Sequence, residues 1–159
     1  MGIEPNAHGA PSENDVNVAA PVHMLNVVEA MALLGVVLMP ANEQGTMAHA
    51  VLNDVSFSFG LLPATLFVRG DRAVGVRTFG ASPAFFLAAN EVTNSAVVGS
   101  VCVMDLEEDL RVRAEVEITI AAGLTPLQLK SALKASVDQV FGLLDRFELS
   151  HKQIAQHSF

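Results

Sequence analysis

The sequence predicts an α+β protein in which helices cover one face of an antiparallel sheet. Residues 55–61 and 110–120 alternate between apolar and polar side chains, which is the period of a strand with one buried face. Residues 125–149 instead place apolar side chains at helical spacing. The strand-like segments follow one another through short turns, so we expect antiparallel pairing, and helices mixed with such strands define the α+β class.

Length and composition exclude several classes of protein. The chain has 159 residues, which suits one domain, with 51% hydrophobic and 16% charged residues, so its composition is not that of a disordered chain. The longest apolar run, residues 30–41, is shorter than the roughly 20 residues of a membrane-spanning helix. We therefore expect a soluble, cytoplasmic protein without a secretory signal. The net charge of −8 disfavours nucleic acid, and neither nucleic acid nor a membrane is an expected partner.

We divide the chain into a flexible arm (1–20), a single domain (21–150) and a tail (151–159). The arm is rich in Gly, Pro, Ser and Asn and carries no apolar periodicity. A first helix is predicted over residues 22–34, because Pro21 suits a first helical turn and apolar side chains recur at helical spacing.

Three or four strands are predicted before the second helix. Residues 36–39 form a short one, and residues 55–61 form the next after a turn at Asn53-Asp54. Residues 64–69 resume an extended run. Gly70-Asp71 then predicts a turn, after which the chain returns.

The second half reads as helix, hairpin, helix. Ser82 as N-cap predicts a helix over residues 83–94, and residues 97–104 and 110–120 predict a hairpin around an acidic turn. Thr125 and Gln128 fit a capping box that starts the last helix. This helix is expected to reach about residue 149.

The residue types that support catalysis or metal binding are scattered. Cys102 lies in a strand between apolar neighbours, so we expect a structural, half-buried thiol rather than a nucleophile. The acidic turn at residues 105–109 lacks the ligand spacing and the glycine of a calcium loop. We expect no metal, no cofactor and no enzymatic activity. The histidines, none of which has metal-ligand spacing, are His8, His23, His49, His151 and His157.

Two groups of charged residues leave alternatives open. Glu115 and Glu117 share one strand face and could act as a general acid/base pair only under a covering cleft. The alternative is an exposed ladder of opposite charges with the neighbouring arginines. Arg69 is a candidate anion contact, and a surface ion pair at a turn, with Asp71, is the alternative interpretation.

Several segments, in their order along the chain, resemble the YbjN domain family, particularly its actinobacterial-type members. A strand ends in LFVRG (66–70), and the next helix carries ANEVTN (89–94), where the family tends to show an Asn-Asp-Trp-Asn run. The hairpin ends in AEV (114–116). GLTPLQL (123–129) is similar to the start of the family's final helix, and the resemblance spans about residues 22–149.

The resemblance implies a fold similar to type III secretion chaperones, with helices on a bent antiparallel sheet in the order α-β-β-β-α-β-β-α. Such chaperones are small, acidic, non-enzymatic and usually dimeric, and the family is labelled as proposed sensory-transduction regulators. The sequence departs from the family where its Trp is replaced by Val92 or Thr93, and where a Pro-Lys-type segment is replaced by residues 97–99. A partner surface formed there would be altered in this chain.

Residues and resemblance together predict a non-enzymatic protein-binding module, chaperone-like or regulatory, whose protein partner the sequence does not name. The alternative is a small-molecule sensor or enzyme that uses a cleft between sheet and helices. Arg69, Asn90 and Asn94 are the candidate contacts with a partner or ligand.

A homodimer is also expected, because the chain has more apolar side chains than one compact core readily buries, so some should lie at a shared surface. We place its interface on an exposed sheet face or edge. The residues that would form it are Phe57 and Phe59, or Val101 and Val103.

Overall fold

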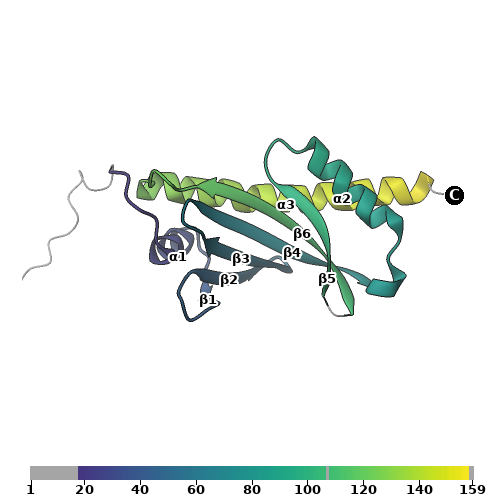
Figure 1. Ribbon diagram of the computed structural model, residues 1–159, viewed down its shortest axis with the longest axis horizontal. Helices are drawn as coiled ribbons and strands as arrows, with labels where there is room; N and C mark the ends of the chain where they lie inside the picture. The colour runs from purple at the N-terminus through teal and green to yellow at the C-terminus, as the bar shows by residue number, and fades with distance from the viewer. Residues whose placement is uncertain (1–17, 107, 158–159) are drawn as a thin grey trace, which may run out of the picture.

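The computed structural model describes residues 18–106 and 108–157 (Figure 1). It confirms the α+β class: a six-stranded antiparallel sheet in the order β1-β2-β3-β4-β6-β5, accompanied by three α-helices. Among the described residues, none of the helices combines the length and the apolar character that crossing a bilayer requires. Along the chain the elements are α1 (Met24–Leu33), β1 (Met39–Pro40), β2 (Met47–Leu52), β3 (Val55–Leu61), β4 (Thr65–Arg77), the 3-10 turn η2 (Thr78–Gly80), α2 (Pro83–Ser95), β5 (Ser100–Leu106), β6 (Asp109–Thr119) and α3 (Pro126–His157).

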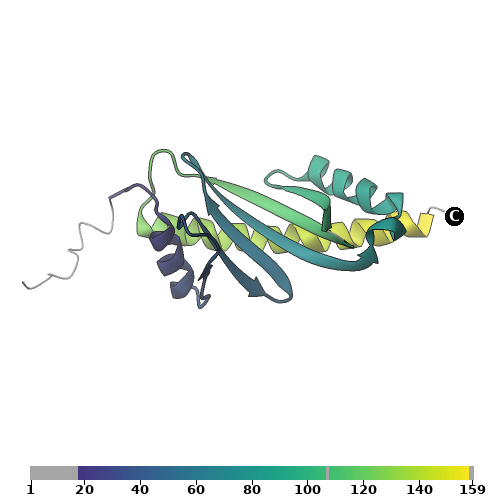
Figure 2. The same cartoon turned by 60° about the horizontal axis from the view of Figure 1, so that its bottom comes forward.

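All three helices lie on the same side of the sheet. Helix α3 runs behind its whole length and contacts β4, β5 and β6, with α1 packed near one end and α2 near the other (Figures 1 and 2). Within the described residues no helix covers the opposite side. We call these two surfaces the covered face and the open face.

The period-2 patterns of β3 and β6 set which side chains are buried. Phe57 and Phe59 are 1% and 0% exposed on the covered face, packed in one core with side chains of α3 such as Leu133. Val101 is buried there too. The expectation that Phe57, Phe59 and Val101 form an exposed dimer surface is therefore wrong, because the helices cover the face that carries them, and Val103 on the same face is half-buried.

Strand β4 continues through the turn predicted at Gly70-Asp71. A Cβ at Gly70 would lie 2.5 Å from Cγ1 of Val140 and 3.0 Å from Cγ1 of Val55. The glycine is therefore required by the close approach of α3 to the sheet rather than by a turn. Since β4 does not bend there, it remains one strand from Thr65 to Arg77.

Strand β2 was not predicted. Its inward side chains are Ala48 and Ala50, which give little hydrophobic contrast with their neighbours. It pairs with β3 across the predicted turn at Asn53 and Asp54, whose φ angles are 48° and 62°. Positive φ at both central residues is typical of a type I′ hairpin turn.

The helix ends follow local capping, with one exception. Helix α1 begins at Met24, where the His23 N–H donates to Asn26 Oδ1 over 2.9 Å, so Pro21 precedes its first turn rather than forming it. Helix α2 begins as predicted. The capping box of α3 is confirmed: Thr125 N–H donates to Gln128 Oε1 over 2.9 Å, and Gln128 N–H donates to Thr125 Oγ1 over 3.1 Å.

The exception is the end of α3, which continues past the predicted residue 149 to His157. Tertiary contacts with α2 hold this part of the helix. The Ser150 hydroxyl donates to Glu91 of α2 over 2.6 Å, and the His151 ring stacks on Phe85 with centroids 4.0 Å apart.

Candidate functional site

A groove of about 310 Å³ opens between the last part of β4 and the helices α2 and α3. Its floor is apolar and its rim is charged, which is the usual composition of a binding site. We call it the β4 groove. The groove is lined by Arg72, Ala73, Val74, Val76, Phe85, Val112, Leu144, Phe147, Glu148, His151 and Lys152.

The charged side chains on the rim neutralise one another. Arg72 Nη1 lies 3.0 Å from Asp145 Oδ1 and 3.7 Å from Glu148 Oε2. Lys152 Nζ lies 3.0 Å from Glu148 Oε1. With its charges paired, the rim adds little net charge, and the apolar floor is the main attraction for a ligand.

One side of the groove is an unpaired strand edge. The ladder between β3 and β4 ends at Ser56 opposite Asp71, whereas β4 continues to Arg77 with β6 on its other side. Beyond Asp71, therefore, no strand of the described chain pairs with β4 on the β3 side. The register with β6 also shifts between Ala73 and Arg77.

The direction of the backbone groups follows from the alternation of an antiparallel ladder. Leu62 N–H donates to Thr65 C=O on the β3 side, and Ile120 N–H donates to Ala64 C=O on the β6 side. Odd-numbered residues of β4 up to Ala73 therefore direct N–H and C=O toward β3. At Ala73 β3 has already ended, so these groups face the open edge beside the groove.

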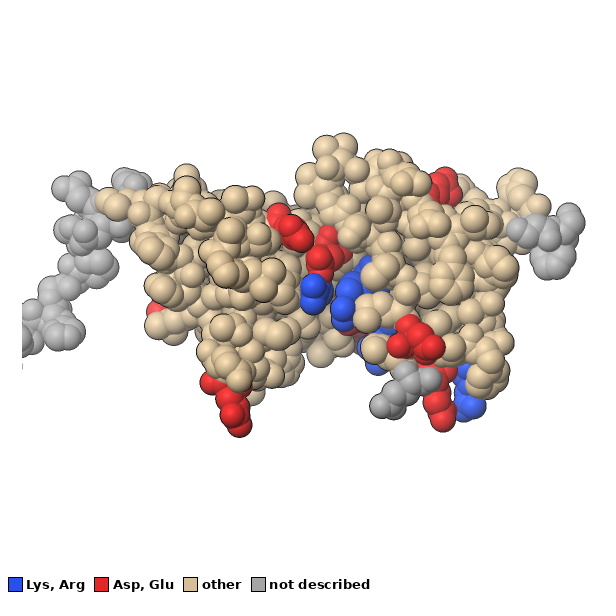
Figure 3. Space-filling model, viewed as in Figure 1, with Lys and Arg blue, Asp and Glu red and all other residues tan. Residues whose placement is uncertain are grey.

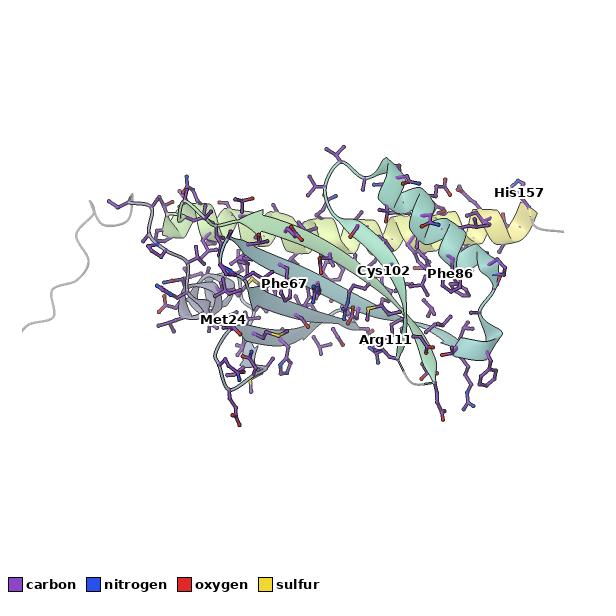
Figure 4. The ribbon with its side chains drawn as sticks, viewed as in Figure 1. Met24, Phe67, Phe86, Cys102, Arg111 and His157 are labelled. Carbon is purple, nitrogen blue, oxygen red and sulfur yellow. The ribbon has the colours of Figure 1, made fainter. Side chains whose placement is uncertain are left out.

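The open face carries a different kind of site. Phe67 is only 7% exposed there, because its ring lies over Gly60 of the neighbouring strand, where a Cβ would overlap the ring. The Arg69 guanidinium lies 4.0 Å above the Phe67 ring centroid, a cation–π geometry. Figure 4 shows Phe67, Cys102 and Arg111 along this face.

Arg69 and Asp71 each pair with the residue directly opposite on β6. Arg69 forms an ion pair with Glu115, and Arg113 donates to both oxygens of Asp71 over 2.7 Å. The hydrogen bond with Asp71 raises the pKa of Arg113 from its usual value. The opposite charges on this face therefore pair across the strands, between β4 and β6, and not among the neighbouring residues of β6 as the sequence suggested. Arg69 pairs with Glu115, so the alternative interpretation of an ion pair with Asp71 at a turn is wrong.

The structure separates the predicted contact residues. Arg69 lies on the open face, whereas Asn90 and Asn94 are exposed on α2, on the other side of the sheet, and line no part of the β4 groove. Their role as partner contacts stays a prediction. Glu115 and Glu117 lie on the open face, where no described element covers them.

Cys102 is exposed on the outward side of β5, opposite Arg113, so the expectation of a half-buried thiol is wrong. Partial desolvation by the surrounding side chains raises the pKa of its thiol. Among residues 18–106 and 108–157, no three His, Cys, Asp or Glu side chains gather as a metal site would require. His8 and Glu107 lie outside the described residues.

Sequence reasoning missed the β4 groove. The sequence does contain a signal for it. Apolar side chains occupy even-numbered positions both before Gly70 (Leu66, Val68) and after it (Val74, Val76), so they share one face, as in a single long strand. The end of β3 opposite Asp71 depends on the β2–β3 turn, which the sequence did place.

No protein-family model and no curated protein matches the sequence. Among solved structures, the fold is similar to that of YbjN from E. coli, described as a proposed transcription regulator. The TM-score is 0.66 at 13% sequence identity, over 86% of this chain and 97% of that chain. The protein therefore has a YbjN-like α+β fold.

Proposed function

We propose that the protein is a non-enzymatic binding module, chaperone-like or regulatory, that takes an extended segment of a partner protein along the unpaired edge of β4. The observation that carries this proposal is that β4 continues to Arg77 while β3 stops opposite Asp71. An added strand obtains affinity from main-chain hydrogen bonds and specificity from pockets for alternate side chains.

The β4 groove supplies such a pocket. An incoming strand that continues the line of β3 would direct every second side chain to the covered side of the sheet, toward Val74, Val76 and Phe85. Each apolar side chain buried there contributes about 1.5–3 kcal/mol. We therefore propose a partner segment with alternating apolar residues and no proline at the paired positions.

The description of the YbjN neighbour as a regulator supports a regulatory role for the fold. The net charge of −8 opposes close contact with a polyanion. We propose that any regulation passes through a protein partner rather than through direct contact with DNA.

The test is selection of random peptides displayed on phage, followed by measurement of their affinities. Ala73→Pro removes the N–H that faces the open edge, at a kind of position where strands tolerate proline. Ala121→Pro is the matched control, because Ala121 is exposed at the second position of the turn closed by Gly123 N–H and Ile120 C=O. We expect selected peptides to bind Ala73→Pro about tenfold more weakly, as loss of main-chain hydrogen bonds predicts, and to bind the control unchanged. Selection of no peptide, or equal binding by both variants, would contradict the proposal.

The groove also supports a second function, a sensor of a small molecule. Its volume lies at the lower end of the range for ligand pockets, and Arg72, His151 and Lys152 bring polar groups to an apolar floor. A groove variant, Val76→Lys, separates the two functions. A small molecule that raises the melting temperature should lose its effect in Val76→Lys but not in Ala73→Pro, whereas a peptide should lose affinity in both.

A further inference from the structure

The outward residues of β6 form an antisymmetric charge pattern. In order they are Arg111, Arg113, Glu115 and Glu117, two cations followed by two anions. On β4, Arg69 lies opposite Glu115 and Asp71 lies opposite Arg113, so each of these four charges has an opposite charge across the strands and beside it along its own strand. Acidic and basic side chains gather in the middle of this face (Figure 3).

This pattern is complementary to itself. A two-fold axis in the plane of the face, perpendicular to the strands and passing between Arg113 and Glu115, sets the face against that of a second copy. Arg111 then faces the second copy's Glu117, and Arg113 faces its Glu115. On β4 the same axis sets Arg69 against the second copy's Asp71, so all six charges meet an opposite charge, and symmetry repeats each pairing.

We propose that the open face binds a second copy of this chain in this orientation. The other in-plane axis, parallel to the strands, would set Arg111 against Ala73 and Glu117 against Phe67, leaving both charges without an opposite. Within the described residues, Arg111 and Glu117 form no ion pair in their own chain. A second copy supplies opposite charges that the described part of the chain does not place beside these two residues.

The surroundings of the charges permit two sheets to approach. The outward residues on β3 and β5 beside the four central charges are small, namely Ser56, Ser58, Ser100 and Cys102, and Met104 beside Arg111 is the larger exception. Sheets that pack face to face lie about 10 Å apart with their strands nearly aligned. The proposed two-fold axis places the strands of the two copies in such an alignment. The interface differs from the apolar one expected from composition, and its specificity comes from charge.

A charge exchange that preserves every ion pair within the chain tests the orientation. In the single exchange, Arg69→Glu with Glu115→Arg, the pair across the strands remains, but each strand now presents like charges to its symmetry mate. In the full exchange, Asp71→Arg with Arg113→Asp is added, and opposite charges again face each other across the axis, with the sign reversed at these four positions. Both variants have the same two arginines and two acidic residues at the four positions as the wild type. Circular dichroism checks that both are folded.

Sedimentation equilibrium over a wide concentration range measures the association. We expect the wild type to dimerise, the single exchange to dimerise about 100-fold more weakly because like charges face each other, and the full exchange to recover. The wild-type association should weaken with salt, because screening shortens from about 10 Å at 0.1 M to about 3 Å at 1 M. Wild type that stays monomeric throughout, a single exchange that dimerises as wild type does, or a folded full exchange that fails to recover would each overturn the proposal.

Alkylation of Cys102 gives a second measurement. The proposed axis sets Cys102 against the second copy's Ser100, so its rate of reaction with iodoacetamide should fall as wild-type concentration rises and stay constant in the single exchange. Val76→Lys changes the β4 groove on the covered side and should leave the dimer intact. The dimer and the binding of a partner segment can therefore fail independently.

Discussion

The two faces of the sheet differ in what they contribute: the covered face is apolar and buried, and the open face carries paired charges. Along β6, Val112 and Ala114 are 1% and 0% exposed under α3, whereas the intervening Arg113 lies in the ion-pair ladder of the open face. Burial of apolar area supplies most of the folding free energy, and exposed ion pairs contribute little. The free energy of unfolding therefore depends mainly on the side chains of the covered face. The charges of the open face can change with little effect on folding, so their arrangement can serve binding.

The largest effect should come from truncating a side chain of the covered face. Phe59→Ala removes a fully buried ring and should lower the free energy of unfolding by about 3–5 kcal/mol. Its neighbour on the same strand, Ser58→Ala, changes the open face and should stay within about 0.5 kcal/mol. Urea denaturation measures both. If the two variants were similar in stability, the division between the faces would be wrong.

The next effect tests how closely α3 approaches the sheet. Gly70→Ala places a methyl group against Val140, whose branched side chain adapts poorly, and should cost about 1–3 kcal/mol. Gly142→Ala is the control: a Cβ there meets nothing within 4 Å, and replacing an exposed helical glycine should stabilise the protein by about 0.5–1 kcal/mol.

A second substitution identifies the cause of the Gly70 effect. Val140→Ala removes the methyl group with which the new Cβ collides. The double variant should therefore be less unstable than the sum of the two single changes. Strict additivity would show that the cost of Gly70→Ala does not come from Val140, and the close contact with Val55 of β3 would be the next candidate.

Gly70 also shows how far the sequence could predict the fold. The strand patterns of β3 and β6 and the capping box at Thr125 are local, so they were read correctly from the residues alone. The role of Gly70 depends on Val140, far along the chain, and no local pattern distinguishes that need from a turn. The end of α3 at His157 depends in the same way on contacts with α2.

The candidate sites also contain features that local sequence predicts and features that depend on tertiary contacts. The charge ladder of the open face was an explicit alternative, because alternation places the charges of β6 on one side. The partners of Arg69 and Asp71 require the register between β4 and β6, which the sequence does not reveal. The β4 groove requires in addition the register of β3 against β4 and the length of α3, both of which are tertiary properties.

The smallest effect concerns the ion pairs themselves. Asp71 and Arg113 form a two-bond pair with side chains 14% and 25% exposed, whereas Lys134 and Asp138 on α3 are 64% and 63% exposed. A double-mutant cycle to alanine should give a coupling of about 1 kcal/mol for the first pair and about 0.3–0.5 kcal/mol for the second. Both cycles are measured by denaturation at high dilution, so that association does not contribute. A coupling at Asp71–Arg113 no larger than that on the helix would mean that the open-face ladder adds nothing special to the monomer, and its charge order would then have to be explained by binding alone.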